Sequence, residues 1–199
     1  MPRISLSART ERRQQILDAA WRCAGRKGFR VMSVDEICAE AGVSKGAFYG
    51  YFESKQALLL ALLADDTAAL DRIVEHLESE MVRSIDRLRH FVRAMLERGD
   101  EPARVQVRAD LWAEMLTDKA VRERFTAAVG HRRTALRGWI ERAVANAELV
   151  EIPANAFAAV LLALGDGLGL HAGLDPTGFR WANIRKAVGV MLERLSPDA

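Results

Sequence analysis

The sequence predicts an almost wholly α-helical protein. Ala, Leu, Arg and Glu, which favour helices, dominate the 199-residue chain, and only five residues are proline. No segment shows the sustained alternation of apolar and polar residues that a half-buried strand requires. We expect about nine helices, arranged as an N-terminal three-helix domain (1–55) that contains a helix-turn-helix and a larger helical domain (56–199).

The first predicted helix covers residues 11–28. Thr10 can cap its N-terminus, and Gly28 can end it. Its apolar residues lie three or four positions apart, so they share one helix face that should be buried. They are Ile16, Ala19, Ala20, Cys23 and Ala24.

Residues 33–55 contain two short helical patterns joined by a tight turn. Ser33, with Glu36 three residues later, forms a capping box that starts the first helix. The turn is Ala41-Gly42-Val43, and Ser44 can cap the second helix. This layout is typical of a helix-turn-helix, which sets its second helix into the major groove of DNA.

The later predicted helices are longer. No linker rich in Pro, Gly or Ser separates the parts, so the fourth helix should run on from the DNA-binding domain. We expect the later helices at residues 55–78, 82–98, after a break at 99–102 to about residue 116, at 117–146 and 154–172, and in a last segment that ends near residue 195.

Net charge is small but uneven. The chain carries +2 overall, whereas residues 1–55 carry ten Lys and Arg against six Asp and Glu, a net of +4. The remaining residues carry 19 basic against 21 acidic side chains, a net of −2. The basic end coincides with the helix-turn-helix and is a modest electrostatic footprint for phosphate.

Other features favour a cytoplasmic protein. The apolar stretch 157–170 is interrupted by Gly and Asp and is too short to span a membrane, and residues 1–13 lack the apolar core of a secretory signal. Cys23 and Cys38 are too few for a disulfide framework. A reducing cytoplasm is therefore expected, with no membrane partner.

No catalytic or metal-binding constellation stands out. The four His residues lack ligand-like spacing, and no Ser-His-Asp or Cys-His arrangement is suggested. Residues 167–172 fit G-x-G-x-x-A, but they lie in an alanine-rich helical pattern without a strand, which indicates helix packing. We expect no enzyme, no metal and no cofactor.

The stretch from Arg13 to Leu60 closely resembles the N-terminal domain of TetR-family transcriptional regulators. The likeness spans about a quarter of the chain in unbroken register. It rests on Ile16-Leu17-Asp18-Ala19-Ala20, Gly28-Phe29, Ser33-Val34, Ile37, Ala41-Gly42-Val43-Ser44-Lys45-Gly46, Phe48-Tyr49, Tyr51-Phe52 and Ser54-Lys55.

The C-terminal part more loosely resembles the choline-responsive, BetI-like branch of that family. This likeness rests on Leu111-Trp112-Ala113-Glu114, Ala163-Leu164, Asp166-Gly167-Leu168 and Leu174-Asp175-Pro176. Together the resemblances imply three partners: a palindromic double-stranded DNA operator, a second copy of the protein and a small-molecule inducer.

A DNA-contacting surface is predicted on the helix at residues 44–52. Gly46 and Ala47 allow close backbone approach, and Ser44 with the helix N-terminus presents donors suited to a phosphate. The resemblance assigns DNA contacts to two lysines and two tyrosines. The full predicted set is Ser33, Ser44, Lys45, Gly46, Ala47, Tyr49, Gly50, Tyr51 and Lys55.

Few long side chains are available for reading bases. Gly50 stands where many relatives carry a larger residue, so direct readout would depend on Lys45 and apolar contact from Ala47. DNA shape should carry part of the specificity. The alternative is that Tyr49 and Tyr51 are core residues and the lysines are solvated.

A ligand cavity is predicted among the middle helices, mainly from the resemblance. For each residue the alternative is plain core packing, and a choline-like cation would need an aromatic cage, to which Trp112 and Trp139 could contribute. The candidate residues are Phe91, Met95, Trp112, Met115, Leu116, Phe125, Val129, Leu136, Trp139 and Asp166.

The helix at 154–172 is apolar almost all round, and the final helix repeats the pattern. Such helices must be buried on both sides, which a two-fold dimer in a four-helix bundle would achieve. A monomer with an apolar C-terminus is the alternative. The predicted interface residues are Leu161, Leu162, Gly165, Leu168, Gly169, Trp181, Ile184, Val188, Met191 and Leu195.

The sequence therefore predicts a sequence-specific DNA-binding transcriptional regulator. We expect a homodimeric repressor that an inducer releases from its operator. An activator or a ligand-independent DNA-binding protein of the same fold is the first alternative. An enzyme or a small-molecule carrier built on the helical domain is the second.

Overall fold

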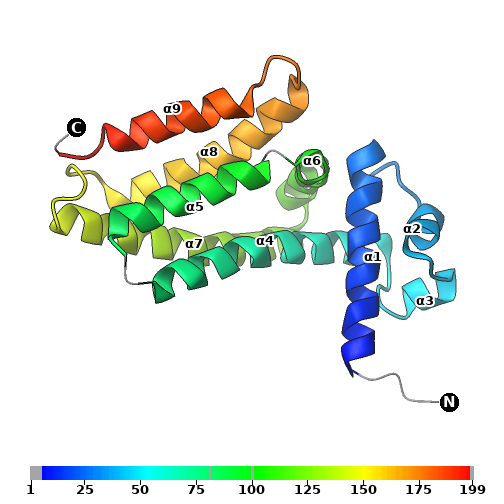
Figure 1. Cartoon of the computed structure of the whole chain (residues 1–199). Coiled ribbons are helices and arrows are strands. Elements are labelled where there is room, and N and C mark those ends of the chain that lie inside the picture. Colours follow the sequence, from blue (N-terminus) through cyan, green and yellow to red (C-terminus); the bar gives the residue numbers. More distant parts are fainter. Residues whose placement is uncertain (1–5, 81, 100, 198–199) are drawn as a thin grey trace. The chain divides into compact units, whose positions relative to one another are not determined.

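The computed structural model describes residues 6–80, 82–99 and 101–197, and within these residues it contains nine helices and no strand (Figure 1). The all-α prediction and the expected number of helices are confirmed. The helices are α1 (Leu6–Lys27), α2 (Val34–Ala41), α3 (Lys45–Tyr49), α4 (Lys55–Ser79), α5 (Ser84–Gly99), α6 (Pro102–Thr117), α7 (Lys119–Ala145), α8 (Ala154–Leu174) and α9 (Trp181–Glu193).

Several helix boundaries differ from the predicted ones. The prediction that Thr10 caps the first helix is wrong, because α1 begins at Leu6 and the Thr10 hydroxyl donates to the Leu6 carbonyl within the helix. α3 covers five residues rather than nine. α8 continues to Leu174, beyond the predicted end.

Packing divides the chain into two compact units. The first combines the described residues through Asp66 with Pro102–Arg122, and the second combines Thr67–Glu101 with the described residues from Glu123 onward. α6 thus packs in the first unit, although it follows the predicted domain boundary after residue 55. The division after residue 55 into a DNA-binding domain and a regulatory domain stays a prediction.

In the first unit, α1 packs against both α2 and α6. The crossing with α6 is close, since a Cβ at Gly25 would come within 2.8 Å of the Ala103 Cβ. Charge also holds α6, because the buried Asp66 of α4 pairs with Arg104 and with Arg108 (Nη2–Oδ2 2.9 Å). α6 is therefore an integral part of this unit.

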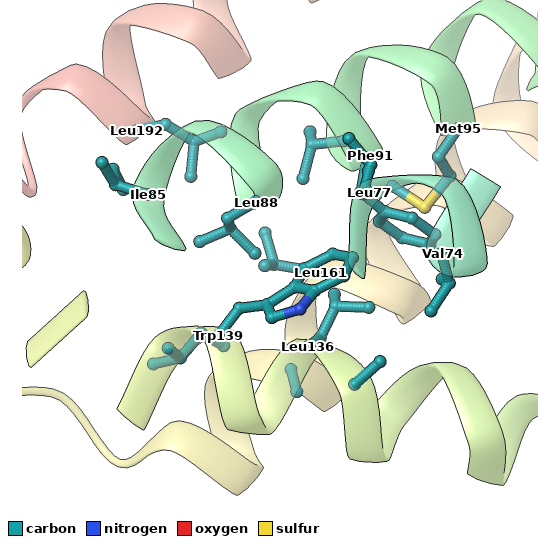
Figure 2. Packing of buried hydrophobic residues seen from close by; sticks show 14 of the residues in the cluster. Val74, Leu77, Ile85, Leu88, Phe91, Met95, Leu136, Trp139, Leu161 and Leu192 are labelled. Carbon is teal, nitrogen blue, oxygen red and sulfur yellow. The ribbon is translucent and has the colours of Figure 1, made fainter. Parts of the chain in front are cut away.

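The core of the second unit surrounds Trp139 (Figure 2). Trp139 is fully buried and meets the Phe91 ring edge-on, with centroids 6.2 Å apart. α5 and α8 approach closely, because a Cβ at Gly165 would lie 2.5 Å from the Met95 Sδ. This core is closely packed around its aromatic side chains.

α8 is buried on one side only. The exposed fractions of Val160, Leu170 and Leu174 are 58%, 44% and 74%. By length and composition α8 could cross a bilayer, so the prediction that this segment is too short to do so is wrong. Its other side belongs to the core. The core-facing residues are Ala158, Leu161, Gly165 and Gly169.

α9 is one-sided in the same way. Val188 and Leu192 are buried, whereas Val190 and Met191 are 45% and 62% exposed. The two C-terminal helices thus each carry an apolar side that the described residues of this chain leave uncovered.

Candidate DNA-binding interface

Local hydrogen bonds set the geometry of the α2–α3 segment. The Ser33 hydroxyl accepts from the Glu36 amide, and the Glu36 carboxylate accepts from the Ser33 amide, which confirms the predicted capping box. α2 ends at Gly42 in the left-handed conformation (φ 63°). The Ser44 hydroxyl accepts from the Ala47 amide (3.1 Å) and starts α3. The turn is thus fixed by bonds on both sides.

Aromatic packing anchors α3 from within. Phe48 is fully buried, and its ring lies 5.7 Å from that of the buried Phe52. Tyr49 meets Phe48 edge-on at 5.3 Å but remains 48% exposed. The buried rings therefore hold α3 in place while its opposite side faces solvent.

Six of the nine predicted DNA-contacting residues lie in α3 or directly after it. A Cβ at Gly46 would meet nothing nearer than 4.0 Å, so the surface there is smooth and open. Among the described residues, neither tyrosine hydroxyl has a hydrogen-bond partner. The exposed residues are Lys45, Gly46, Tyr49 and Gly50, and Ala47 and Tyr51 are half-buried.

Lys45 forms an ion pair that sequence reasoning missed. Its ammonium lies 2.8 Å from Oδ1 of Asp35, which stands in the first turn of α2. The hydrogen bond to Asp35 raises the pKa of Lys45. Both side chains are more than half exposed. The contact joins two different helices, α2 and α3, so no local spacing in the sequence indicates it.

Lys55 is engaged inside the first unit. Its ammonium donates to the Arg30 carbonyl (2.9 Å) and lies 5.0 Å from the centre of the Phe29 ring. Burial lowers the pKa of Lys55. Asp110 of α6 supports the same turn by accepting from the Phe29 amide (2.9 Å). A phosphate contact for Lys55 stays a prediction, while its support of the α1–α2 turn is observed.

The predicted ligand-binding residues lie in different environments. Phe91, Met95, Leu136 and Trp139 are packed in the core of the second unit, where Phe125, Val129 and Asp166 are half-buried. Trp112, Met115 and Leu116 belong to α6 in the first unit. Because the Trp139 ring is enclosed by core side chains, it has no open face for a cation. Ligand binding by this set stays a prediction.

A groove of about 620 Å³ lies between α5 and α9 in the second unit. Its floor is apolar and buried, with Val92, Leu96, Val188 and Leu192, and its rim is charged. None of the predicted ligand-binding residues lines it.

The predicted dimer residues lie mostly on the inner sides of α8 and α9. Leu161, Gly165, Gly169 and Val188 are buried, and Leu162, Leu168, Trp181, Ile184 and Leu195 pack partly buried against the core. Met191 is the exposed member of the set. The sequence could not distinguish the core-facing side of α8 from its exposed side, because apolar residues occur all round this helix.

Family comparison agrees with this geometry. The family model described as bacterial regulatory proteins of the tetR family matches residues 16–62, which include α2 and α3. A second model, the C-terminal part of BetI-type transcriptional repressors, matches residues 84–197, more than half of the chain. The chain belongs to the TetR family. The predicted resemblance is thereby confirmed for both parts.

Named relatives are regulators of the same kind. A transcriptional repressor from Corynebacterium diphtheriae, AcnR, is 29% identical over 149 residues, which are 75% of this chain and 72% of the relative. The regulator YerO from Bacillus subtilis is 45% identical over 51 residues, 26% of this chain and only 18% of its own length. These names support a DNA-binding transcriptional regulator and not an enzyme.

A solved structure extends the likeness to nearly the whole chain. It is a transcriptional regulator from Saccharomonospora viridis in complex with choline, 25% identical, with a TM-score of 0.81. The alignment covers 92% of this chain and 96% of that one. The fold of this TetR-family chain is therefore that of a regulator solved with a small molecule bound.

Proposed function

We propose that this TetR-family protein is a cytoplasmic, homodimeric repressor that binds a palindromic operator and leaves it when a small molecule binds. The observation that carries the proposal is the α2–α3 surface, capped at both helices and smooth on its outward side. A dimer would place two such surfaces on successive half-sites of one operator. TetR-family membership supports the same reading.

The uncovered apolar sides of α8 and α9 support the dimer. Leu170 and Leu174 on α8 and Val190 and Met191 on α9 are 44–74% exposed. Exposed apolar patches of this kind mark interaction sites. A second copy of the chain, related by a two-fold axis, would cover the same side on both protomers. The predicted dimer residues that are buried in α8 and α9 would then pack beneath this interface and hold the two helices in position.

Regulation would act through a coupling between two binding sites. A coupling of about 1–3 kcal/mol gives a 5–150-fold loss of operator affinity on inducer binding, and the inducer in turn binds the DNA-bound form more weakly. The choline found with the S. viridis regulator makes choline the first compound to test.

The experiment is a titration of the full-length protein onto the intergenic DNA beside its own gene, at physiological salt with excess competitor DNA. Tight, competitor-resistant binding supports a specific, autoregulating DNA-binding protein. Repeating the titration with choline and then with a panel of other small molecules tests induction. Operator affinity that no compound changes would sink the induced-release mechanism but leave DNA binding standing.

A further inference from the structure

The Asp35–Lys45 ion pair joins the first turn of α2 to the first turn of α3, the proposed recognition helix. Exposed ion pairs such as this one contribute little to stability. Asp35 lies in the first turn of α2, where a negative charge is favoured by the helix dipole, whereas Lys45 lies in the first turn of α3, where a positive charge is not. The carboxylate therefore holds an ammonium that the local helix disfavours.

The spacing of the pair matches the edge of one base pair. Nζ of Lys45 and Oδ1 of Asp35 are 2.8 Å apart. In the major groove, guanine O6 and cytosine N4 of a G·C pair are hydrogen-bond partners and so lie about 2.9 Å apart. The ammonium is a donor facing the acceptor O6, and the carboxylate is an acceptor facing the donor N4.

We propose that Asp35 and Lys45 together read one G·C pair in each half-site. Lys45 donates to guanine O6 and N7, and Asp35 accepts from cytosine N4. The proposal rests on the proposed function, in which α3 is the recognition helix. It adds Asp35 as a specificity-determining residue and names the base pair that it selects.

Wrong base pairs are penalised by the same two charges. A reversed pair would set the ammonium against the cytosine amino group and the carboxylate against guanine O6, so that both contacts become repulsive. A T·A pair keeps an acceptor, thymine O4, for the ammonium and a donor, adenine N6, for the carboxylate. The thymine methyl group, however, takes the place of the guanine N7 acceptor that Lys45 also uses. Because a carboxylate also repels phosphate, Asp35 lowers affinity for DNA in general and raises the difference between sequences.

The test uses the full-length protein and a duplex DNA library with a randomised central segment. Binding of the enriched duplex is then compared with duplexes in which each conserved G·C pair is replaced in turn. The variants are Asp35→Ala, Lys45→Met and the double substitution. Glu53→Ala is the matched control, since Glu53 is an exposed acid next to α3 that makes no ion pair among the described residues.

We expect the wild-type protein to prefer G·C about tenfold at one position of each half-site. Asp35→Ala should lose most of this preference and bind the replaced duplexes more tightly. Lys45→Met should lose the preference too, and the double variant should lose no more than either single one. Glu53→Ala should change affinity for all duplexes alike.

Two results would overturn the proposal, and they are distinguishable. If Asp35→Ala keeps the wild-type preference, or behaves as Glu53→Ala does, the pair reads no base although the protein still recognises DNA. If the wild-type protein enriches no sequence, recognition by α3 itself fails, and the proposed function fails with it. Thermal unfolding of each variant by circular dichroism verifies that α2 and α3 remain folded.

Discussion

The α2–α3 pair and the α8–α9 pair are both helices joined by a turn, but they are stabilised in opposite ways. In the first, Ser33 and Ser44 bond to the backbone amides of their own helices, and polar or small residues face outward. In the second, neither N-cap makes a side-chain hydrogen bond, and large apolar side chains stay exposed. The apolar side of the first pair is covered within its own unit, where α1 packs against α2, whereas the apolar sides of α8 and α9 remain partly uncovered.

Disrupting the uncovered side of α8–α9 should have the largest effect. Leu170→Glu combined with Met191→Glu places charges on that side without touching the core, because both side chains are 44–62% exposed. We expect monomers by analytical ultracentrifugation. We also expect operator affinity to fall by about 10²–10⁴-fold, the advantage of linking two binding events.

Val82→Glu is the matched control, since Val82 is an apolar residue with 43% exposure outside α8 and α9. It should leave both the oligomeric state and operator affinity unchanged. A dimer that survives the double substitution would show that this side of the two helices does not form the interface.

Removing a large side chain from the core of the second unit should have a slightly smaller effect, on the free energy of unfolding. Trp139→Ala removes a fully buried ring that packs on Phe91, so we expect a loss of about 3–5 kcal/mol in the free energy of unfolding. Trp139→Phe should cost far less, because the indole N–H has no hydrogen-bond partner among the described residues. Urea unfolding followed by circular dichroism measures both. Equal losses would mean that Phe does not restore the packing of the larger indole ring, so that the shape of the whole indole stabilises this core.

Sequence patterns predicted the α2–α3 pair better than the α8–α9 pair for a physical reason. Caps at Ser33 and Ser44 involve residues three positions apart, so spacing alone reveals them. The inward side of α8 depends on distant partners such as Met95, and apolar residues all round the helix conceal which side that is.

The same limit applied within the candidate site. The support of the Phe29 amide by Asp110 joins residues 81 positions apart. The pair of Asp35 and Lys45 depends on how two helices cross. Neither contact can be predicted from local spacing, although the residues on the exposed side of α3 could be.

Substituting two glycines of the α2–α3 segment should change the stability of the protein in opposite directions. Gly42→Ala forces a side chain into the left-handed conformation (φ 63°), and we expect a loss of about 1–2 kcal/mol. Gly46→Ala meets open space in a helix and should stabilise the protein by up to about 1 kcal/mol. Thermal unfolding measures both. Weaker operator binding by Gly46→Ala would support close backbone approach to DNA, and unchanged binding would count against it.

The smallest expected effect is a pH dependence at the cap of α2. The hydrogen bond from Lys27, followed by that from the Ser33 amide, lowers the pKa of Glu36 from 4.5 to about 2. Because the folded-state pKa is depressed, this stabilisation is present above the unfolded-state pKa and is lost as pH falls toward 2. Glu36→Gln should therefore be less stable than wild type at pH 7, and the gap in urea unfolding should close between about pH 4.5 and pH 2. A gap that stays constant with pH would mean that hydrogen bonding at the cap, which Gln preserves in part, matters and the charge of Glu36 does not.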